Sequence, residues 1–221
     1  MDPDKVSRAN KAMAKAYKPA RERITEFKIN WNIVSWPGSA WASRVFPELP
    51  LDEAIVKLAD AIFDASRASV DDPIQAWDDH NEKLRIKTNW LNEKNFAALQ
   101  YNGPNTNLRV GLADEHEWMG GASKAQNGII CNPNIPSEEV FTTPHAHKVD
   151  GTVSSTKPLS YQGTLIDNIK VTFKDGKIIE AHANKGEEVL QKVLKSDEGA
   201  SRIGEVALVP HSSPISQSGI I

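Results

Sequence analysis

One segment of the sequence, NPNIPSEEVFTTPHAHKVDG, gathers the residue types that bind metals or move protons. It contains the adjacent glutamates Glu138 and Glu139, the histidines His145 and His147, and Asp150. Carboxylate oxygens and imidazole nitrogens are the ligands that zinc and similar divalent ions take in proteins. The same groups act as general acids and bases in hydrolysis. This segment is therefore the first candidate for a metal or acid–base site.

The two histidines have a spacing that puts both rings on one side of an extended backbone. Asp150 could then complete a set of three ligands. However, the surrounding residues are loop-forming, and no distant partner is evident in the sequence. Spacing alone therefore predicts a solvated loop at His145 and His147.

The glutamates give three candidate carboxylates. Glu138 and Glu139 precede the β-like run VFTT, and in a strand their side chains point to opposite faces, so only one of them can face a site. A lone glutamate at the start of a strand is more often a surface charge. Glu205 lies in GEVALVP, which predicts a buried strand, and a buried carboxylate needs a cation or hydrogen-bond donors. That cation is either a metal or Arg202, three residues earlier.

The sequence shows no pattern typical of serine hydrolysis, phosphate binding or cysteine catalysis. No serine lies in a G-x-S-x-G elbow and no G-x-x-x-x-G-K-S/T phosphate loop occurs. Cys131 is the single cysteine and has no activating neighbours, so it is predicted to be structural, and neither an intrachain disulfide nor a thiolate zinc cage can form. The reducing cytoplasm is the expected compartment.

The composition is that of a soluble globular protein, with 39% hydrophobic and 25% charged residues. A net charge of -3 gives no broad positive field, so nucleic acid is not an expected partner. No apolar run is long enough to span a membrane, and the charged start of the chain lacks the apolar core of a secretory signal.

The elements that must position these residues change along the chain. One helix is predicted from Asp4 to about Phe27, and a second begins at Ser39, which is expected to be its cap. A third helix begins at Leu51 and carries an apolar stripe, and a fourth begins at Pro73 with Asp72 as its cap. INWNIVSWP, between the first two helices, is predicted to be a strand buried on both faces, and the six tryptophans are expected mostly in the core.

Short apolar runs broken by Gly, Asn and Pro follow, and they predict strands. The clearest is a hairpin through Asp175 and Gly176, before a helix in EEVLQKVLKSD and a strand in RIGEVALVP. The fold class is therefore α/β (α+β). We expect a helical α/β portion over 1–98 and a β-rich portion over 99–221.

Five segments together resemble the thermophilic metalloprotease family, which includes aminopeptidases T and S and PepS. They occur in the family's order across nearly the whole chain: INWNIVSWPGSAWASRVFP, WLNEKNFAALQYNGPNTNLRVGL, NIPSEEVFTTP, VDGTVSSTKPLSYQGTLIDN and RIGEVALVPHSSPISQSGII. The resemblance implies a soluble, dimeric aminopeptidase that removes residues from the free N-terminus of peptides. It also implies two divalent metal ions, zinc or cobalt.

The resemblance assigns two metal-binding glutamates residue by residue. Glu139, directly before Val140, matches the first, with Glu138 as a neighbour that the motif lets vary, and Glu205 matches the second. The family does not draw ligands from the positions of His145 and His147. No residue of this chain is assigned as a general acid or base.

The resemblance also implies that this chain is a fragment. The family's other ligands, two histidines, an aspartate and a nearby tyrosine, match positions beyond Ile221, and a further region precedes the match at Asp4. The chain is thus expected to be roughly half of a family member with an incomplete metal site. The alternative is a non-catalytic binding or dimerisation module derived from such an enzyme.

Overall fold

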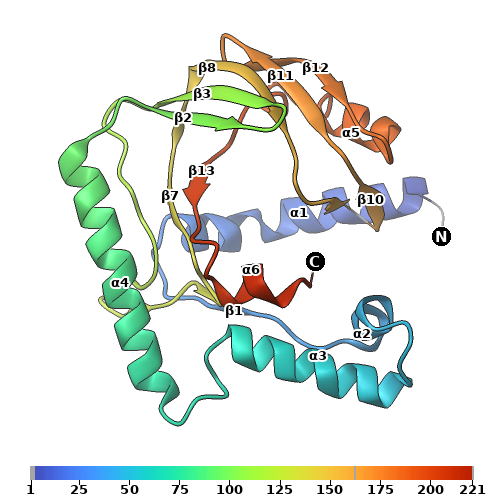
Figure 1. Ribbon diagram of the computed structural model, residues 1–221, viewed down its shortest axis with the longest axis vertical. Coiled ribbons are helices and arrows are strands. Elements are labelled where there is room, and N and C mark those ends of the chain that lie inside the picture. Colours follow the sequence, from blue (N-terminus) through green and yellow to red (C-terminus); the bar gives the residue numbers. More distant parts are fainter. Residues whose placement is uncertain (1–2, 162, 221) are drawn as a thin grey trace. The chain divides into compact units, whose positions relative to one another are not determined.

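The computed structural model describes residues 3–161 and 163–220, with most of the helical residues in the first half of the chain and most of the strands in the second half (Figure 1). This confirms the predicted α/β (α+β) class. Across these residues, no helix combines the length and the apolar composition that crossing a membrane requires. The helices are α1 (Pro3–Thr25), α2 (Ser39–Val45), α3 (Leu51–Ala65), α4 (Pro73–Lys94), α5 (Glu187–Val193) and α6 (Pro214–Ser218).

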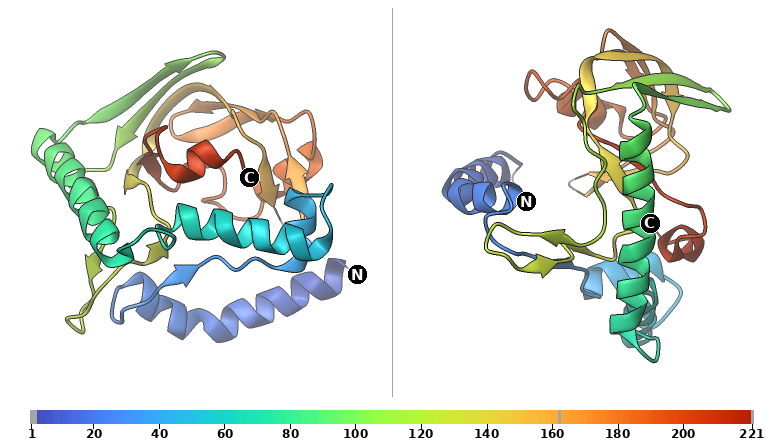
Figure 2. Two further views of the ribbon diagram at one scale, coloured as in Figure 1. Left: turned by 60° about the horizontal axis from the view of Figure 1, so that its bottom comes forward. Right: turned by 90° about the vertical axis from the view of Figure 1, so that its left-hand side faces the viewer.

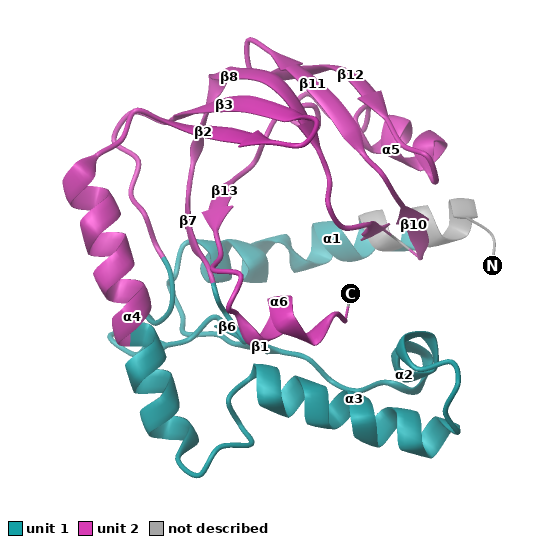
Figure 3. Ribbon diagram, viewed as in Figure 1, with its two compact units in different colours: residues 1–81, 120–138 teal, residues 82–119, 139–221 magenta. Residues whose placement is uncertain are grey.

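The chain forms two compact units, each built from two separate stretches (Figure 3). Unit 1 comprises Met1–Asn81 and Gly120–Glu138, and unit 2 comprises Glu82–Met119 and Glu139–Ile221. The expected division into 1–98 and 99–221 follows composition along the chain, whereas the units follow contacts in space.

Unit 1 has a small apolar core between α2 and α3. Leu58 is 1% exposed and lies with Ala42 and Ala54 at its centre, and Ile55 and Ile62 pack against them. The predicted apolar stripe of α3 is therefore largely correct, because residues three or four apart share one helix face. Its first member, Leu51, is instead 47% exposed.

The segment before α2 differs from the prediction. Only Ile33–Val34 form a strand, β1, which pairs in parallel with β6 (Asn134–Ile135). Ile33 and Trp36 are 60% and 81% exposed, so the expectation of a strand buried on both faces is wrong. A ladder of two residues is too short to form the interior of a sheet. Gly38 holds the N-cap position of α2, so Ser39 is its first helical residue and not its cap.

The start of α4 is as predicted. The amide of Gln75 donates a hydrogen bond of 3.0 Å to the Asp72 carboxylate, which caps the helix and satisfies one of its free N–H groups. Leu84 and Leu91 are buried, whereas Ile74 at the start of the helix is 77% exposed.

Unit 2 is built around an antiparallel sheet with the strand order β12-β11-β8-β3-β2, which Figure 2 shows from two further sides. Leu84 and Leu91 of α4 join Leu108, Val149 and Phe173 of the sheet in its core. The sheet strands are β2 (Ala98–Gly103), β3 (Thr106–Leu112), β8 (Pro144–Ser154), β11 (Lys170–Lys174) and β12 (Lys177–His182).

Four short pairs complete the strands. Unit 1 contains the β1–β6 pair and a second pair, in which β4 (Ser123–Lys124) pairs with β5 (Ile130–Cys131). In unit 2, β9 (Leu159–Tyr161) pairs with β10 (Thr164–Ile166), and β7 (Val140–Thr142) pairs with β13 (Val206–Leu208).

The predicted hairpin through Asp175 and Gly176 joins β11 and β12. Both residues have positive φ, 49° and 79°, as a tight primed turn requires. A Cβ on Gly176 would lie 1.9 Å from the Ala146 carbonyl oxygen. Asp175 and Gly176 therefore fix both the turn and its close contact with β8.

We expect Gly176→Ala to lower the free energy of unfolding of unit 2 by about 1–3 kcal/mol, because the new methyl group combines backbone strain with a steric clash. Urea denaturation measures this loss. Gly103→Ala is the matched control, since a Cβ there meets nothing within 4 Å. Equal losses in the two variants would contradict the steric explanation.

Candidate metal centre

The two glutamates assigned by the resemblance border one short ladder in unit 2. β7 and β13 pair in antiparallel register, with Val206 opposite Thr142 and Leu208 opposite Val140. Glu139 directly precedes β7 and Glu205 directly precedes β13. The ladder therefore links two residues that are 66 positions apart in the sequence.

Both glutamates lie on the same face of this ladder when the strand alternation is continued by one residue at each start. Side chains alternate between faces along a strand, so Glu139 shares a face with Phe141, and Glu205 shares a face with Ala207. Phe141 is paired with Ala207, which makes these two faces one. The opposite face carries the buried Val140 and Val206.

The charge of Glu205 acts on Glu139. Partial burial raises the pKa of the Glu139 carboxyl above its ordinary value, and the negative charge of Glu205 raises this pKa further. Two carboxylates that repel each other beside an apolar surface are stabilised by a shared cation. The pair therefore has the donor chemistry that a divalent metal ion needs.

Glu205 itself differs from the prediction, because its side chain is exposed. The expected burial was wrong since the strand that follows it is only three residues long and Glu205 stands before it. Arg202 donates a hydrogen bond to the Ala146 carbonyl oxygen, and no ion pair joins it to Glu205 among the described residues. Glu205 therefore needs no cation to compensate for burial.

The histidine pair also differs from the prediction. His145 and His147 lie in the strand β8 and not in a solvated loop. Their ring centroids are 6.1 Å apart, and the register with β3 is interrupted between Val110 and Leu112, opposite these residues. The Asp150 carboxylate accepts a 2.9 Å hydrogen bond from the amide of Asp175. Over residues 3–161 and 163–220 no group of three His, Cys, Asp or Glu side chains is placed to hold a metal ion.

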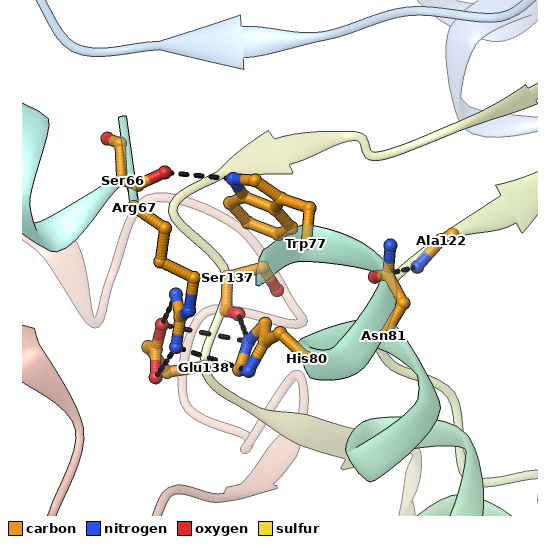
Figure 4. Close-up of polar contacts among 8 residues, drawn as sticks. All are labelled: Ser66, Arg67, Trp77, His80, Asn81, Ala122, Ser137 and Glu138. Atoms are coloured by element: carbon orange, nitrogen blue, oxygen red, sulfur yellow. Dashed lines mark hydrogen bonds and ion pairs between the residues drawn. The ribbon is translucent and has the colours of Figure 1, made fainter. Parts of the chain in front are cut away.

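Glu138, the neighbour of Glu139, belongs to unit 1 and is buried, with 7% exposure. Its carboxylate accepts two hydrogen bonds from the Arg67 guanidinium, at 2.6 and 3.1 Å (Figure 4). Such a two-point contact between an arginine and a carboxylate is directional as well as charged. Glu138 is therefore fixed in unit 1 by a buried ion pair.

His80 completes this network in unit 1 (Figure 4). Its Nδ1 lies 3.1 Å from an Arg67 nitrogen, which can only donate, so Nδ1 accepts. Its Nε2 then carries the proton and donates to the Ser137 carbonyl oxygen at 2.6 Å. These contacts define a neutral histidine that holds the backbone just before Glu138. No local sequence pattern indicates this cluster, since Arg67 and Glu138 are 71 residues apart.

The comparison with protein families decides the relationship. The model of the thermophilic metalloprotease (M29) family matches residues 1–221. The chain belongs to this family. The resemblance found in the sequence is thereby confirmed.

Several relatives within the thermophilic metalloprotease family are aminopeptidases. The chain is 51% identical to Aminopeptidase T of Thermus thermophilus, 47% identical to Aminopeptidase 2 of Geobacillus stearothermophilus and 43% identical to Aminopeptidase AmpS of Bacillus subtilis, each over 221 residues. It spans about half, 54%, of the length of each. The expectation that it corresponds to roughly half of a family member is confirmed.

A solved structure of wild-type AmpT from Thermus thermophilus has the same fold. It superposes on this chain with a TM-score of 0.93 at 50% sequence identity, covering 100% of this chain and 54% of the other. The thermophilic metalloprotease fold is therefore present over the matched residues. Membership of the family implies dependence on a divalent metal, and Glu139 and Glu205 fit that requirement chemically.

The raised pKa of Glu139 predicts how the metal-free chain responds to pH. The pKa of Glu139 is higher in the folded state than in the unfolded state, so its carboxyl ionises less readily when the chain is folded. The folded chain therefore becomes less stable as the pH rises above the ordinary pKa of 4.5, until the pH exceeds the raised pKa. Glu139→Gln removes this loss. We expect this substitution to raise Tm by about 1–2 °C at pH 7 and to leave Tm unchanged at pH 4. Scanning calorimetry in the presence of a metal chelator measures Tm at both pH values. A lower Tm at pH 7 would contradict this.

Proposed function

We propose that this chain supplies two metal-binding carboxylates, Glu139 and Glu205, to a metallo-aminopeptidase that removes residues from the free N-terminus of peptides. The observation that carries the proposal is that the two glutamates share one face of the β7–β13 ladder and that the charge of one raises the pKa of the other. The names of three family relatives support the aminopeptidase activity. Two ions of zinc or cobalt, a homodimer and a cytoplasmic location are part of the proposal.

The chemistry follows from what lies around the carboxylates. Bound divalent cations lower the pKa of water and polarise the carbonyl of the peptide bond. Glu139 and Glu205 would hold these cations, and Phe141 and Ala207 lie on the face between them. An apolar surface beside charged groups lowers the local dielectric and strengthens their interactions.

Two carboxylates form an incomplete ligand set, because catalytic sites of this kind use at least three protein ligands for zinc. We therefore infer that the isolated chain binds zinc weakly and does not hydrolyse peptides by itself. Calorimetric titration with zinc, together with an assay on leucine p-nitroanilide, tests this inference. Tight stoichiometric binding and turnover by the isolated chain would reject it.

The activity itself is best tested in a chimera. The chain replaces the matched segment of Aminopeptidase T from Thermus thermophilus, to which it is 51% identical over 221 residues. We expect the folded chimera to hydrolyse leucine p-nitroanilide in the presence of zinc or cobalt, and N-acetyl-leucine p-nitroanilide at less than about one hundredth of that rate, since acetylation removes the charged amine. A folded, metal-loaded chimera without this activity would overturn the proposal.

A further inference from the structure

The buried cluster of Arg67, His80 and Glu138 in unit 1 lies directly before a proposed metal ligand in the sequence. Glu138 ends a stretch of unit 1, and one peptide bond joins it to Glu139, which begins a stretch of unit 2. The Arg67 guanidinium holds the Glu138 carboxylate at two points. His80 donates a hydrogen bond to the carbonyl oxygen of Ser137, the preceding residue. The cluster therefore holds both the side chain of Glu138 and the backbone before it.

Arg67 occupies a backbone position that usually belongs to glycine. It directly follows Ser66, the C-cap of α3, and its φ is 57°, in the left-handed region. The amide of Arg67 donates to the Asp64 carbonyl oxygen, and the amide of Ala68 donates to that of Phe63, which are the two hydrogen bonds of a Schellman helix end. Glycine adopts this conformation freely, whereas a side chain strains it. The arginine side chain therefore makes interactions that offset this strain.

Trp77 packs against both groups that hold the segment 137–138. Its Nε1 donates a 2.8 Å hydrogen bond to the carbonyl oxygen of Ser66, directly before Arg67. The Arg67 guanidinium carbon lies 5.5 Å from the centre of the Trp77 ring, within the range of a cation–π contact. The His80 ring meets the same indole edge-on, with the ring centroids 5.5 Å apart. One aromatic side chain thus limits the movement of Arg67 and His80.

The ion pair in this cluster provides fixed geometry more than stability. Replacement of a buried ion pair by apolar residues of similar volume is often neutral or stabilising, because the desolvation of two charges offsets their attraction. The two hydrogen bonds from Arg67 to Glu138, of 2.6 and 3.1 Å, instead fix both a distance and a direction. The cluster therefore gives Glu138 a defined position.

Glu139 follows this cluster and precedes the β7–β13 ladder along the chain. The first pair of the ladder on β7 is Val140 with Leu208, so strand pairing begins only after Glu139. Groups that orient a metal ligand contribute about ten- to a hundredfold to metal affinity, because the ligand must keep one direction. Glu139 is thus restrained along the chain from both sides, by strand pairing after it and by the cluster before it.

We propose that Arg67, His80 and Glu138 are positioning residues for the metal ligand Glu139, and that they hold the backbone before it so that its carboxylate keeps the direction that metal binding needs. This proposal rests on the proposed function, because it takes Glu139 as a metal ligand. The three residues act through the backbone and not as ligands. Their loss therefore weakens metal binding even where the fold is kept.

The zinc affinity of the metal-free chimera tests the proposal through binding and not through turnover. Arg67→Met combined with Glu138→Leu leaves no unpaired buried charge, but it replaces the directional contact by an apolar one. We expect this double variant to bind zinc about tenfold more weakly than the unsubstituted chimera in a titration against a competing chelator, with a similar Tm. A folded double variant with full zinc affinity would overturn the proposal.

His80 variants provide a second test that leaves both charges of the ion pair in place. His80→Ala removes the donor to the Ser137 carbonyl oxygen. The amide of glutamine has a donor and an acceptor, as the neutral imidazole does, so His80→Gln can keep the contacts with Ser137 and Arg67. We expect zinc affinity to fall about tenfold in His80→Ala and to be largely restored in His80→Gln. Full affinity in His80→Ala, or an equal loss in both variants, would contradict the role of His80.

Leu58→Ala is the matched control for a loss of stability alone. Leu58 is 1% exposed in the core between α2 and α3, and it takes no part in the hydrogen bonds of the cluster. Its truncation leaves a cavity and lowers Tm, but we expect the zinc affinity measured below Tm to be unchanged. A loss of zinc affinity equal to that of the double variant would show that instability of unit 1 weakens binding, and the positioning role would be rejected.

Glu139→Gln in the same titration separates this proposal from the proposed function. If Glu139→Gln retains full zinc affinity, the proposed function itself fails. If Glu139→Gln weakens zinc binding whereas the double variant and His80→Ala bind zinc as the unsubstituted chimera does, the positioning role alone fails.

Discussion

In the chimeric aminopeptidase, Glu139→Gln and Glu205→Gln each lower kcat/KM for leucine p-nitroanilide by at least about a hundredfold. Glutamine keeps the size of the side chain but removes the negative charge that holds a divalent cation. Even groups that only support metal ligands cost about ten- to a hundredfold in affinity or activity when they are replaced, so the loss of a ligand is expected to cost more. Steady-state kinetics at saturating zinc, together with metal analysis, measures the effect.

Glu180→Gln is the matched control, because Glu180 is an exposed glutamate of β12 in the same unit. It removes an equal charge away from the ladder, and kcat/KM is expected to stay within about twofold of the unsubstituted chimera, as for most exposed positions. Full activity with Glu139→Gln or Glu205→Gln in place would remove that glutamate from the proposed site.

The second large effect is on stability. Arg67→Met is expected to lower the free energy of unfolding of unit 1 by about 3–5 kcal/mol, because it leaves the Glu138 carboxylate buried without its cation. The side chains of Arg67 and Glu138 are only 17% and 6% exposed, so solvent cannot replace the lost partner. Urea denaturation measures this loss, with unfolding of unit 1 monitored by hydrogen exchange in the peptides that cover residues 60–81 and 120–138.

Two further variants test the explanation. Arg85→Met breaks the exposed ion pair between Arg85 and Glu82, 2.6 Å long, and we expect no measurable change in stability because solvent screens exposed pairs. Arg67→Met combined with Glu138→Leu removes both buried charges, so we expect it to recover most of the loss. A double variant that is as unstable as Arg67→Met would show that packing, and not the unpaired charge, dominates.

Local sequence patterns predicted the elements that depend on neighbours in the chain. Asp72 caps α4 because the hydrogen bond joins residues three positions apart. Asp175 and Gly176 form the predicted hairpin because both adopt the positive φ that a primed turn demands. The stripe of Leu58, Ile55 and Ile62 follows from the helical period. In each case the residues that decide the structure lie close to one another in the sequence.

The predictions that failed depended on distant neighbours. Apolar composition predicted burial for Ile33 and Trp36, which are exposed because a sequence does not show whether another layer will cover a segment. The tryptophans differ for the same reason, since Trp118 is 2% exposed whereas Trp90 is 50% exposed. The loop-forming residues around His145 and His147 similarly led to the prediction of a loop. These histidines lie in a strand because β3 and β11 pair with it.

The sequence by itself determined the family, the mixed fold class and the identity of Glu139 and Glu205 as candidate ligands, because the motifs that carry them are short and local. The tertiary structure alone decided that these two carboxylates share one ladder face and that Glu138 is held by Arg67 and His80. Strand register, burial and electrostatic repulsion arise between residues tens of positions apart. These features are determined only when the chain folds and brings such residues together.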